Sequence, residues 1–146
     1  MSLLPAAPSR PHTDALEAAL TGVGVLVGRG GRPDDGGWQG EPGRTAFTAY
    51  AVLYPGAGIP DGDLADPSEY LDYRCQVTCV AATSEGAEAV ADKVKTLVGR
   101  RLTVAGRSSY PVWLTLDRPA SRDDSVAPPV HYLVLELAFR TGPAPA

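Results

Sequence analysis

Apolar and polar residues alternate most clearly over 70–81, and this alternation predicts a β-strand. The apolar residues on the expected core face of this strand are Leu71, Tyr73, Cys75, Val77, Cys79 and Ala81. A similar alternation over 131–140 predicts a second long strand, and its core face would carry Leu133, Leu135, Leu137 and Phe139. Shorter strands are expected at 23–27, 47–54, 102–105 and 112–116.

Apolar residues at helical spacing predict two helices. The first is expected to begin with Thr13 as its N-cap and to stop at Gly22. The second is expected to begin at Thr83 or Ser84 and to stop at Gly99. The element order predicts an α+β fold, a single mixed or mostly antiparallel sheet of about five to six strands with two helices on one face. The other face would be solvated or would dock a partner subunit.

One domain over residues 13–140 is expected, with a flexible arm at 1–12 and a loose proline-rich tail at 141–146. The glycine-rich segment 28–46 and the polar segment 117–129 are expected to be long loops. Trp38 is the bulky apolar residue of the glycine-rich loop. It either anchors a contact with another subunit or folds back on its own core.

Composition narrows the class of protein. The chain has 146 residues, 44% of them hydrophobic, and a net charge of −4, which indicates a globular chain and disfavours a nucleic-acid binder. No apolar run has the length of a membrane span, and the first residues lack the pattern of a signal peptide, so we expect maturation in a cytoplasm. Cys75 and Cys79 would lie about 13 Å apart along one strand face, too far for a disulfide.

Patterns that carry chemistry are weak in this chain. The segment 61–66 is similar to a calcium loop, but Ala65 and Asp66 stand where a ligand and a glycine are required. No dinucleotide, Walker or zinc pattern has the right spacing. Ser108 and Ser109 lack a nucleophile elbow, and a small hydrolase using Ser109 and His131 is a remote alternative. We assign no catalytic residue, cofactor or metal.

Charged residues in loops are candidates for contacts between subunits. Arg100 and Arg101 either complement a helix C-terminus or meet the acidic loop 61–66 of a neighbour. The loop 117–129 carries both signs of charge, which is typical of a solvated loop and also of a polar interface rim. The candidate interface residues are Trp38, Asp61, Asp63, Asp66, Arg100, Arg101, Arg118, Arg122, Asp123 and Asp124.

Turn and packing motifs in four segments carry a resemblance to a known family. The segments are 52–58, 61–67, 73–87 and 91–94. These segments resemble motifs of the tail terminator proteins of actinobacterial long-tailed (siphovirus-type) phages. In chain order the family motifs are a Leu-Tyr-Pro-Gly-Gly turn, an Asp-Gly-Ser-Leu segment, a Gln-Val-Thr strand with a Thr-x-Glu-Gln-Ala helix start, and an Ala-Asp-Arg-Val continuation. The chain departs from this pattern at Ala57, Asp63 and Gly86, and loop 28–46 is richer in glycine.

The resemblance covers about residues 13–140 and implies a structural subunit without catalytic residues or a cofactor. In that family the subunit forms a ring, commonly hexameric, that ends tube polymerisation at the head-proximal end of the tail. The implied partners are identical copies, the tail tube protein and the head–tail connector or stopper protein. Genomic DNA would pass through an acidic lumen without specific binding.

The implied location is the virion, after assembly in the host bacterial cytoplasm. The alternative functions are another head-to-tail connector (a stopper) or a tail tube protein.

Overall fold

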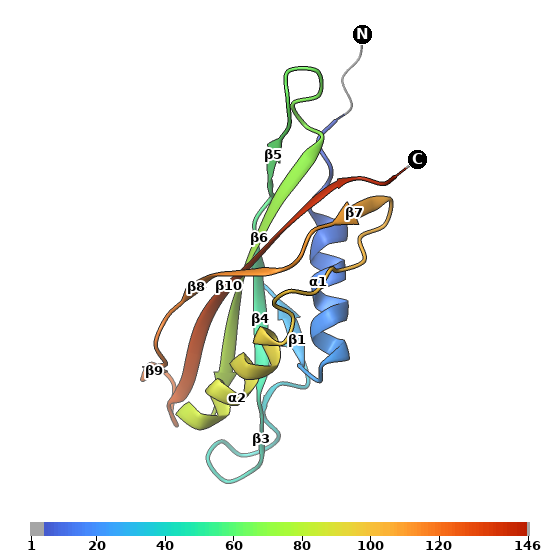
Figure 1. Cartoon of the computed structure of the whole chain (residues 1–146). Helices are drawn as coiled ribbons and strands as arrows, with labels where there is room; N and C mark the ends of the chain where they lie inside the picture. Colours follow the sequence, from blue (N-terminus) through green and yellow to red (C-terminus); the bar gives the residue numbers. More distant parts are fainter. Residues whose placement is uncertain (1–4, 146) are drawn as a thin grey trace.

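The computed structural model describes residues 5–145, which form two helices, one large sheet and one small sheet (Figure 1). The elements in chain order are α1 (Arg10–Gly22), β1 (Val27–Arg29), β2 (Gly37–Trp38), β3 (Phe47–Thr48), β4 (Tyr50–Pro55), β5 (Ile59–Asp61), β6 (Tyr70–Ala81), α2 (Ser84–Lys95), β7 (Arg107–Ser109), β8 (Trp113–Asp117), β9 (Ser121–Asp123) and β10 (Val130–Pro143).

Two long antiparallel strands, β6 and β10, form the centre of the large sheet. On the far side of β6, β4 and β5 lie one after the other, and β1 runs parallel to β4. On the far side of β10, β7, β8 and β9 lie in succession. The expected α+β fold with a mixed sheet is confirmed, but the sheet has eight strands instead of five to six. The count is larger because both flanks consist of short strands joined by irregular segments.

Both helices cover one face of this sheet (Figure 1). Residues of α1 and α2 share a single buried cluster with the core-facing side chains of β6 and β10. Leu16 and Leu20 come from α1, and Val94 comes from α2. Each fully buried side chain of this kind contributes about 1.5–3 kcal/mol to the free energy of unfolding, so this face holds most of the hydrophobic stabilisation.

Helix α1 begins earlier than the sequence pattern indicated. It starts at Arg10 with Pro11 in its first turn, whereas we expected Thr13 to be the N-cap. Thr13 is instead buried, and its hydroxyl lies 2.5 Å from the Tyr73 hydroxyl. Residues 10–12 of the expected flexible arm are therefore helical, and residues 1–4 lie outside the described residues.

Strand β10 continues past the expected end at residue 140, because its last residues have partners. Thr141 is fully buried and pairs with Ser109 of β7. His12 donates from Nδ1 to the Pro8 carbonyl (2.9 Å), so its Nε2 is free to accept from the Thr141 hydroxyl at 2.6 Å. Residues 141–143 thus belong to the sheet and not to a loose tail, and residue 146 lies outside the described residues.

Several expected loops contain short strands. Segment 28–46 holds β2, which pairs with β3, and the Trp38 and Phe47 rings meet edge to face with centroids 5.1 Å apart. Segment 117–129 holds β9, and β5 ends at the first residue of the acidic loop 61–66. The strand expected at 102–105 is absent, since Leu102 and Val104 join the core without pairing in the sheet.

Candidate functional site

Among the described residues 5–145, no helix covers the second face of the large sheet, here called the open face. Its polar residues come from the same strands as the core: Asp72, Arg74, Gln76 and Thr78 of β6, and Glu136 and Arg140 of β10. At one end of this face Phe47 stacks on Tyr50, with ring centroids 6.2 Å apart. Val52 and Val80 are buried on this face, and most of its other side chains are half-buried or exposed.

Large apolar side chains are exposed on the open face. Trp113 is 68% exposed and stands opposite Ala138 in the sheet register. Ile59, 64% exposed, stands opposite Asp72. Tyr110, 45% exposed, shares with Trp113 a hollow of about 490 Å³. Exposed aromatic side chains beside a hollow are typical of the energetic centre of a protein–protein interface.

Arg140 fixes the polar side of the same hollow. Its Nε and Nη2 donate to the two carboxylate oxygens of Asp72 at 2.7 and 2.9 Å, and Nη2 also reaches Asp61. The guanidinium lies 5.0 Å above the centroid of the Tyr70 ring. These hydrogen bonds lower the pKa of Asp72 and raise the pKa of Arg140, so both groups are charged at neutral pH. The result is a preorganised charged rim beside exposed aromatic residues.

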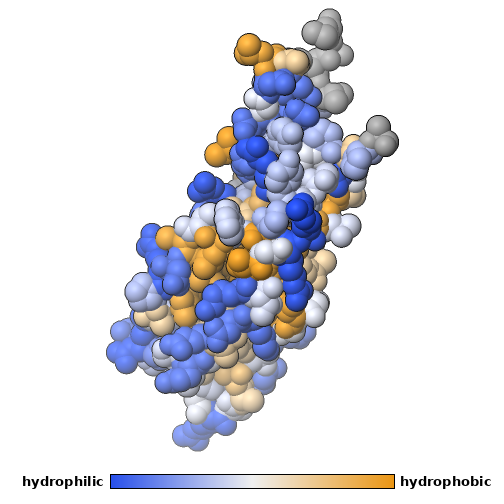
Figure 2. Space-filling model, viewed as in Figure 1, coloured by the Kyte–Doolittle hydropathy of each residue, from blue (hydrophilic) through white to orange (hydrophobic). Residues whose placement is uncertain are grey.

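The predicted acidic residues lie in or beside the long β5–β6 hairpin. Asp61 contacts Arg140, and Asp63 accepts hydrogen bonds from the backbone amides of Ala65 (2.9 Å) and Asp66 (3.0 Å). This hairpin extends away from the body of the molecule (Figure 1), and its end has a hydrophobic surface (Figure 2).

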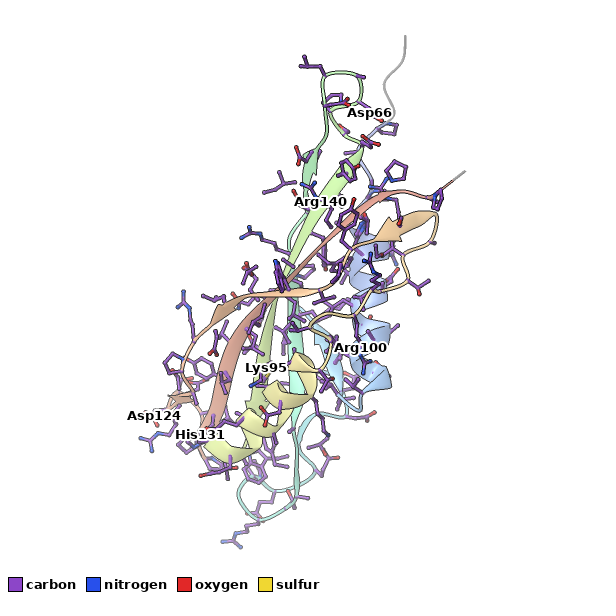
Figure 3. The ribbon with its side chains drawn as sticks, in the orientation of Figure 1. Asp66, Lys95, Arg100, Asp124, His131 and Arg140 are labelled. Atoms are coloured by element: carbon purple, nitrogen blue, oxygen red, sulfur yellow. The ribbon has the colours of Figure 1, made fainter. Side chains whose placement is uncertain are left out.

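The predicted arginines of the α2–β7 connection lie elsewhere. Arg100 is beside the helices, whereas Asp66 is at the far end of the hairpin (Figure 3). Both Arg100 and Arg101 are exposed, and Arg101 donates to the Ser109 carbonyl at 3.0 Å. A contact between these arginines and the acidic loop is therefore not made within one chain.

The remaining predicted residues lie toward the end of the molecule opposite the hairpin. Arg122 pairs with Asp124 at 2.7 Å, and Asp123 accepts from the Ser125 amide at 3.0 Å; Asp124 is labelled in Figure 3. Arg118 is exposed. Trp38 is half-buried against Phe47, outside the main buried cluster. The ten predicted residues are thus dispersed over the molecule and do not form one site.

Hydrolytic residues are not brought together either. Ser109 stands opposite Thr141, which is ten residues along β10 from His131. At the usual rise of a strand this separation is about 33 Å, far beyond hydrogen-bond reach. Within residues 5–145, no three His, Cys, Asp or Glu side chains are grouped to hold a metal ion. No helix in this described part is long and apolar enough to span a bilayer.

Trp113 was not among the predicted interface residues, although the sequence contained a signal for it. The expected strand over 112–116 alternates, and Val112 and Leu114 on its apolar face leave Trp113 on the opposite face. A tryptophan on the outward face of a strand indicates either an interface or a covering loop. In the structure Val112 is fully buried and Trp113 is exposed.

A solved structure shares this fold. A chain described as "Virion of native gene transfer agent (GTA) particle" aligns with a TM-score of 0.57 and 19% identity, over 90% of this chain and 87% of its own length. A second solved chain aligns with a TM-score of 0.46 and 18% identity over 92% of this chain and 98% of its own, too weak a likeness to carry an argument. No protein-family model matches the chain, and no curated protein matches it.

Proposed function

We propose that this chain is a tail terminator subunit of a phage-like particle. Copies would form a hexameric ring at the head-proximal end of the tail tube, end tube polymerisation and offer a docking surface to the head–tail connector. The observation that carries the proposal is the open face of the sheet, where Trp113 and Tyr110 are exposed beside the charged Arg140 cluster. Fold likeness to a virion-particle chain and the family motifs in the sequence support it.

The surface suits assembly better than catalysis. Association needs exposed apolar area surrounded by positioned polar groups, and the open face offers both. A chemical site needs several titratable groups converging on one point, and Ser109 and His131 do not converge. We therefore assign the protein a structural role in the virion, reached after assembly in the host cytoplasm, with DNA passing through the ring lumen.

Three assembly behaviours separate the proposed function from its rivals. The purified chain is weighed by mass photometry alone and with tail tube protein, and tube lengths are measured by negative-stain microscopy. A terminator forms discrete rings and shortens or fixes tube length. A tube subunit forms long tubes by itself, and a stopper leaves tube length unchanged while binding at a ring. A chain that stays monomeric with tube protein and leaves tube length unchanged contradicts the proposal.

A further inference from the structure

The end of the β5–β6 hairpin, residues 61–66, is called the hairpin tip. Leu64 is fully exposed there, and it lies in the sequence between the exposed Asp63 and the half-buried Asp66. The two hydrogen bonds that Asp63 accepts, and the close approach of Gly62 to the Asp66 carbonyl, fix the shape of the turn. A fixed turn loses little conformational entropy when it binds, so the hairpin tip is suited to insertion into another surface.

A complementary hollow lies between α1 and the α2–β7 connection, and is called the arginine notch. Its volume is about 350 Å³, and its lining includes Ala15, Ala18, Ala19, Arg100, Arg101 and Leu102. Small apolar side chains thus form its floor, and two guanidinium groups border it. Neither arginine has an ion-pair partner within residues 5–145.

Acidic groups near the arginine notch do not cancel this charge. Asp14 and Glu17 of α1 each accept hydrogen bonds from Arg29. The hydrogen bonds to Asp14 and Glu17 raise the pKa of Arg29, so its guanidinium stays charged and offsets one of the two carboxylates. Arg100 and Arg101 outweigh the one carboxylate charge left over, so the notch is net positive, whereas the exposed Asp63 makes the hairpin tip negative.

We propose that the hairpin tip of one copy inserts into the arginine notch of the next copy. Leu64 would enter the alanine-lined floor, and the carboxylates of the tip would meet Arg100 and Arg101. The two surfaces are far apart on one chain (Figure 3), so the contact is head-to-tail and leaves one free tip and one free notch until a ring closes. The inference rests on the proposed function and names a contact that would hold the ring together.

A cross-linking experiment tests the position of the contact. The Leu64→Cys/Ala18→Cys chain is assembled and oxidised, and denaturing electrophoresis should show a ladder of covalent oligomers. The native Cys75 and Cys79 are buried, so they do not interfere. The matched control, Leu64→Cys/Glu88→Cys, places the second thiol on the exposed side of α2 and should give no ladder above dimer.

Charge reversal tests the chemistry of the contact. Both Arg100→Glu/Arg101→Glu and Asp63→Lys/Asp66→Lys should lower the fraction of rings by about tenfold or more. An equimolar mixture of the two variants should restore rings, because each reversed notch then meets a reversed tip; this rescue also shows that both variants fold. Asp63→Asn/Asp66→Asn keeps the hydrogen-bond acceptors of the turn, so it isolates the loss of charge.

The outcomes separate this inference from the proposed function. If the wild-type chain forms rings, both charge-reversed variants form them equally well and no cysteine ladder is seen, the hairpin contact is wrong. The proposed ring itself is then unaffected. A wild-type chain that forms no rings, alone or with tube protein, overturns the proposed function and the contact with it. A ladder together with rescue by mixing supports both.

Discussion

The helix-covered face and the open face of the sheet are built from the same strands, yet they differ in what they can do. Leu137 on the covered face is fully buried, whereas Trp113, on the strand beside it, is 68% exposed on the open face. Successive residues of a strand point to opposite faces, so one position separates a residue that stabilises the fold from one available for contact. A substitution should therefore affect stability on one face and association on the other.

The largest effect is expected on the covered face. Leu137→Ala removes a fully buried side chain from the central strand and should lower the free energy of unfolding by about 2–5 kcal/mol. Urea denaturation of the purified chain measures this change. Gln76→Ala on the open face is the control and should stay within about 0.5 kcal/mol of wild type. Equal losses in the two variants would remove the distinction between the faces.

The open face should show the reverse pattern. Trp113→Ala should leave unfolding nearly unchanged but weaken association by about 2 kcal/mol or more, which is roughly a 30-fold rise in the dissociation constant. Mass photometry over a concentration series measures the loss, and Trp113→Phe is the matched control that keeps an aromatic ring. If Trp113→Ala rings dissociate at the same protein concentration as wild-type rings, the open face is not the contact between subunits.

The smallest effect on stability is expected from a change of pH, which acts through His12 on the covered face. Burial lowers the pKa of His12 in the folded chain below its usual 6.5. As pH falls below 6.5, the unfolded chain takes up the proton first, so stability is complete above that pH and declines toward pH 5, by at most about 1.4 kcal/mol per pH unit.

Thermal unfolding of wild type and His12→Gln at several pH values between 5 and 8 measures this contribution. The glutamine variant should be less stable throughout but should lack the decline between pH 6.5 and 5. A decline of the same size in both proteins would assign it to other groups.

Elements with strong local signals were predictable from the sequence. Strand β6 has the bounds that the alternation over 70–81 indicated, since both of its faces are defined by the side chains themselves. Helix α2 begins after Thr83, which accepts a hydrogen bond from the Gly86 amide at 3.0 Å, because capping is a local interaction. Cys75 and Cys79 are free and buried, as expected.

Elements that depend on distant partners were not predictable. Residues 141–143 resemble a loose tail until His12 and Ser109, both far away in sequence, are placed against Thr141. Thr13 resembles an N-cap because its burial against Tyr73 is a tertiary contact. Strand β5 has few apolar residues of its own and exists because β6 extends beyond β4 to pair with it.

The candidate site was also predictable only in part. The sequence indicated that one face of the sheet would lack helices, but the interface residues were predicted from charges in loops, and the strand residue Trp113 was missed. Arg140 was not predicted because its role depends on hydrogen bonds to Asp72 on the neighbouring strand and Asp61 on the hairpin. Only the pairing register of the strands brings these three residues together. Charge alone marks a loop as polar, whereas the positions of its partners decide what the charge does.

The length and late position of β10 have a consequence for how the molecule is made. Strands β7, β8 and β9 pair with β10, and so does β6 along most of its length. During synthesis β7, β8 and β9 must wait for residues 130–143 before they find a neighbour, whereas β6 already has β4 and β5 as partners on its other edge. We expect nascent chains shorter than this to expose unpaired edges and to recruit chaperones, so that the sheet is completed, and any assembly begins, only once the last strand has left the ribosome.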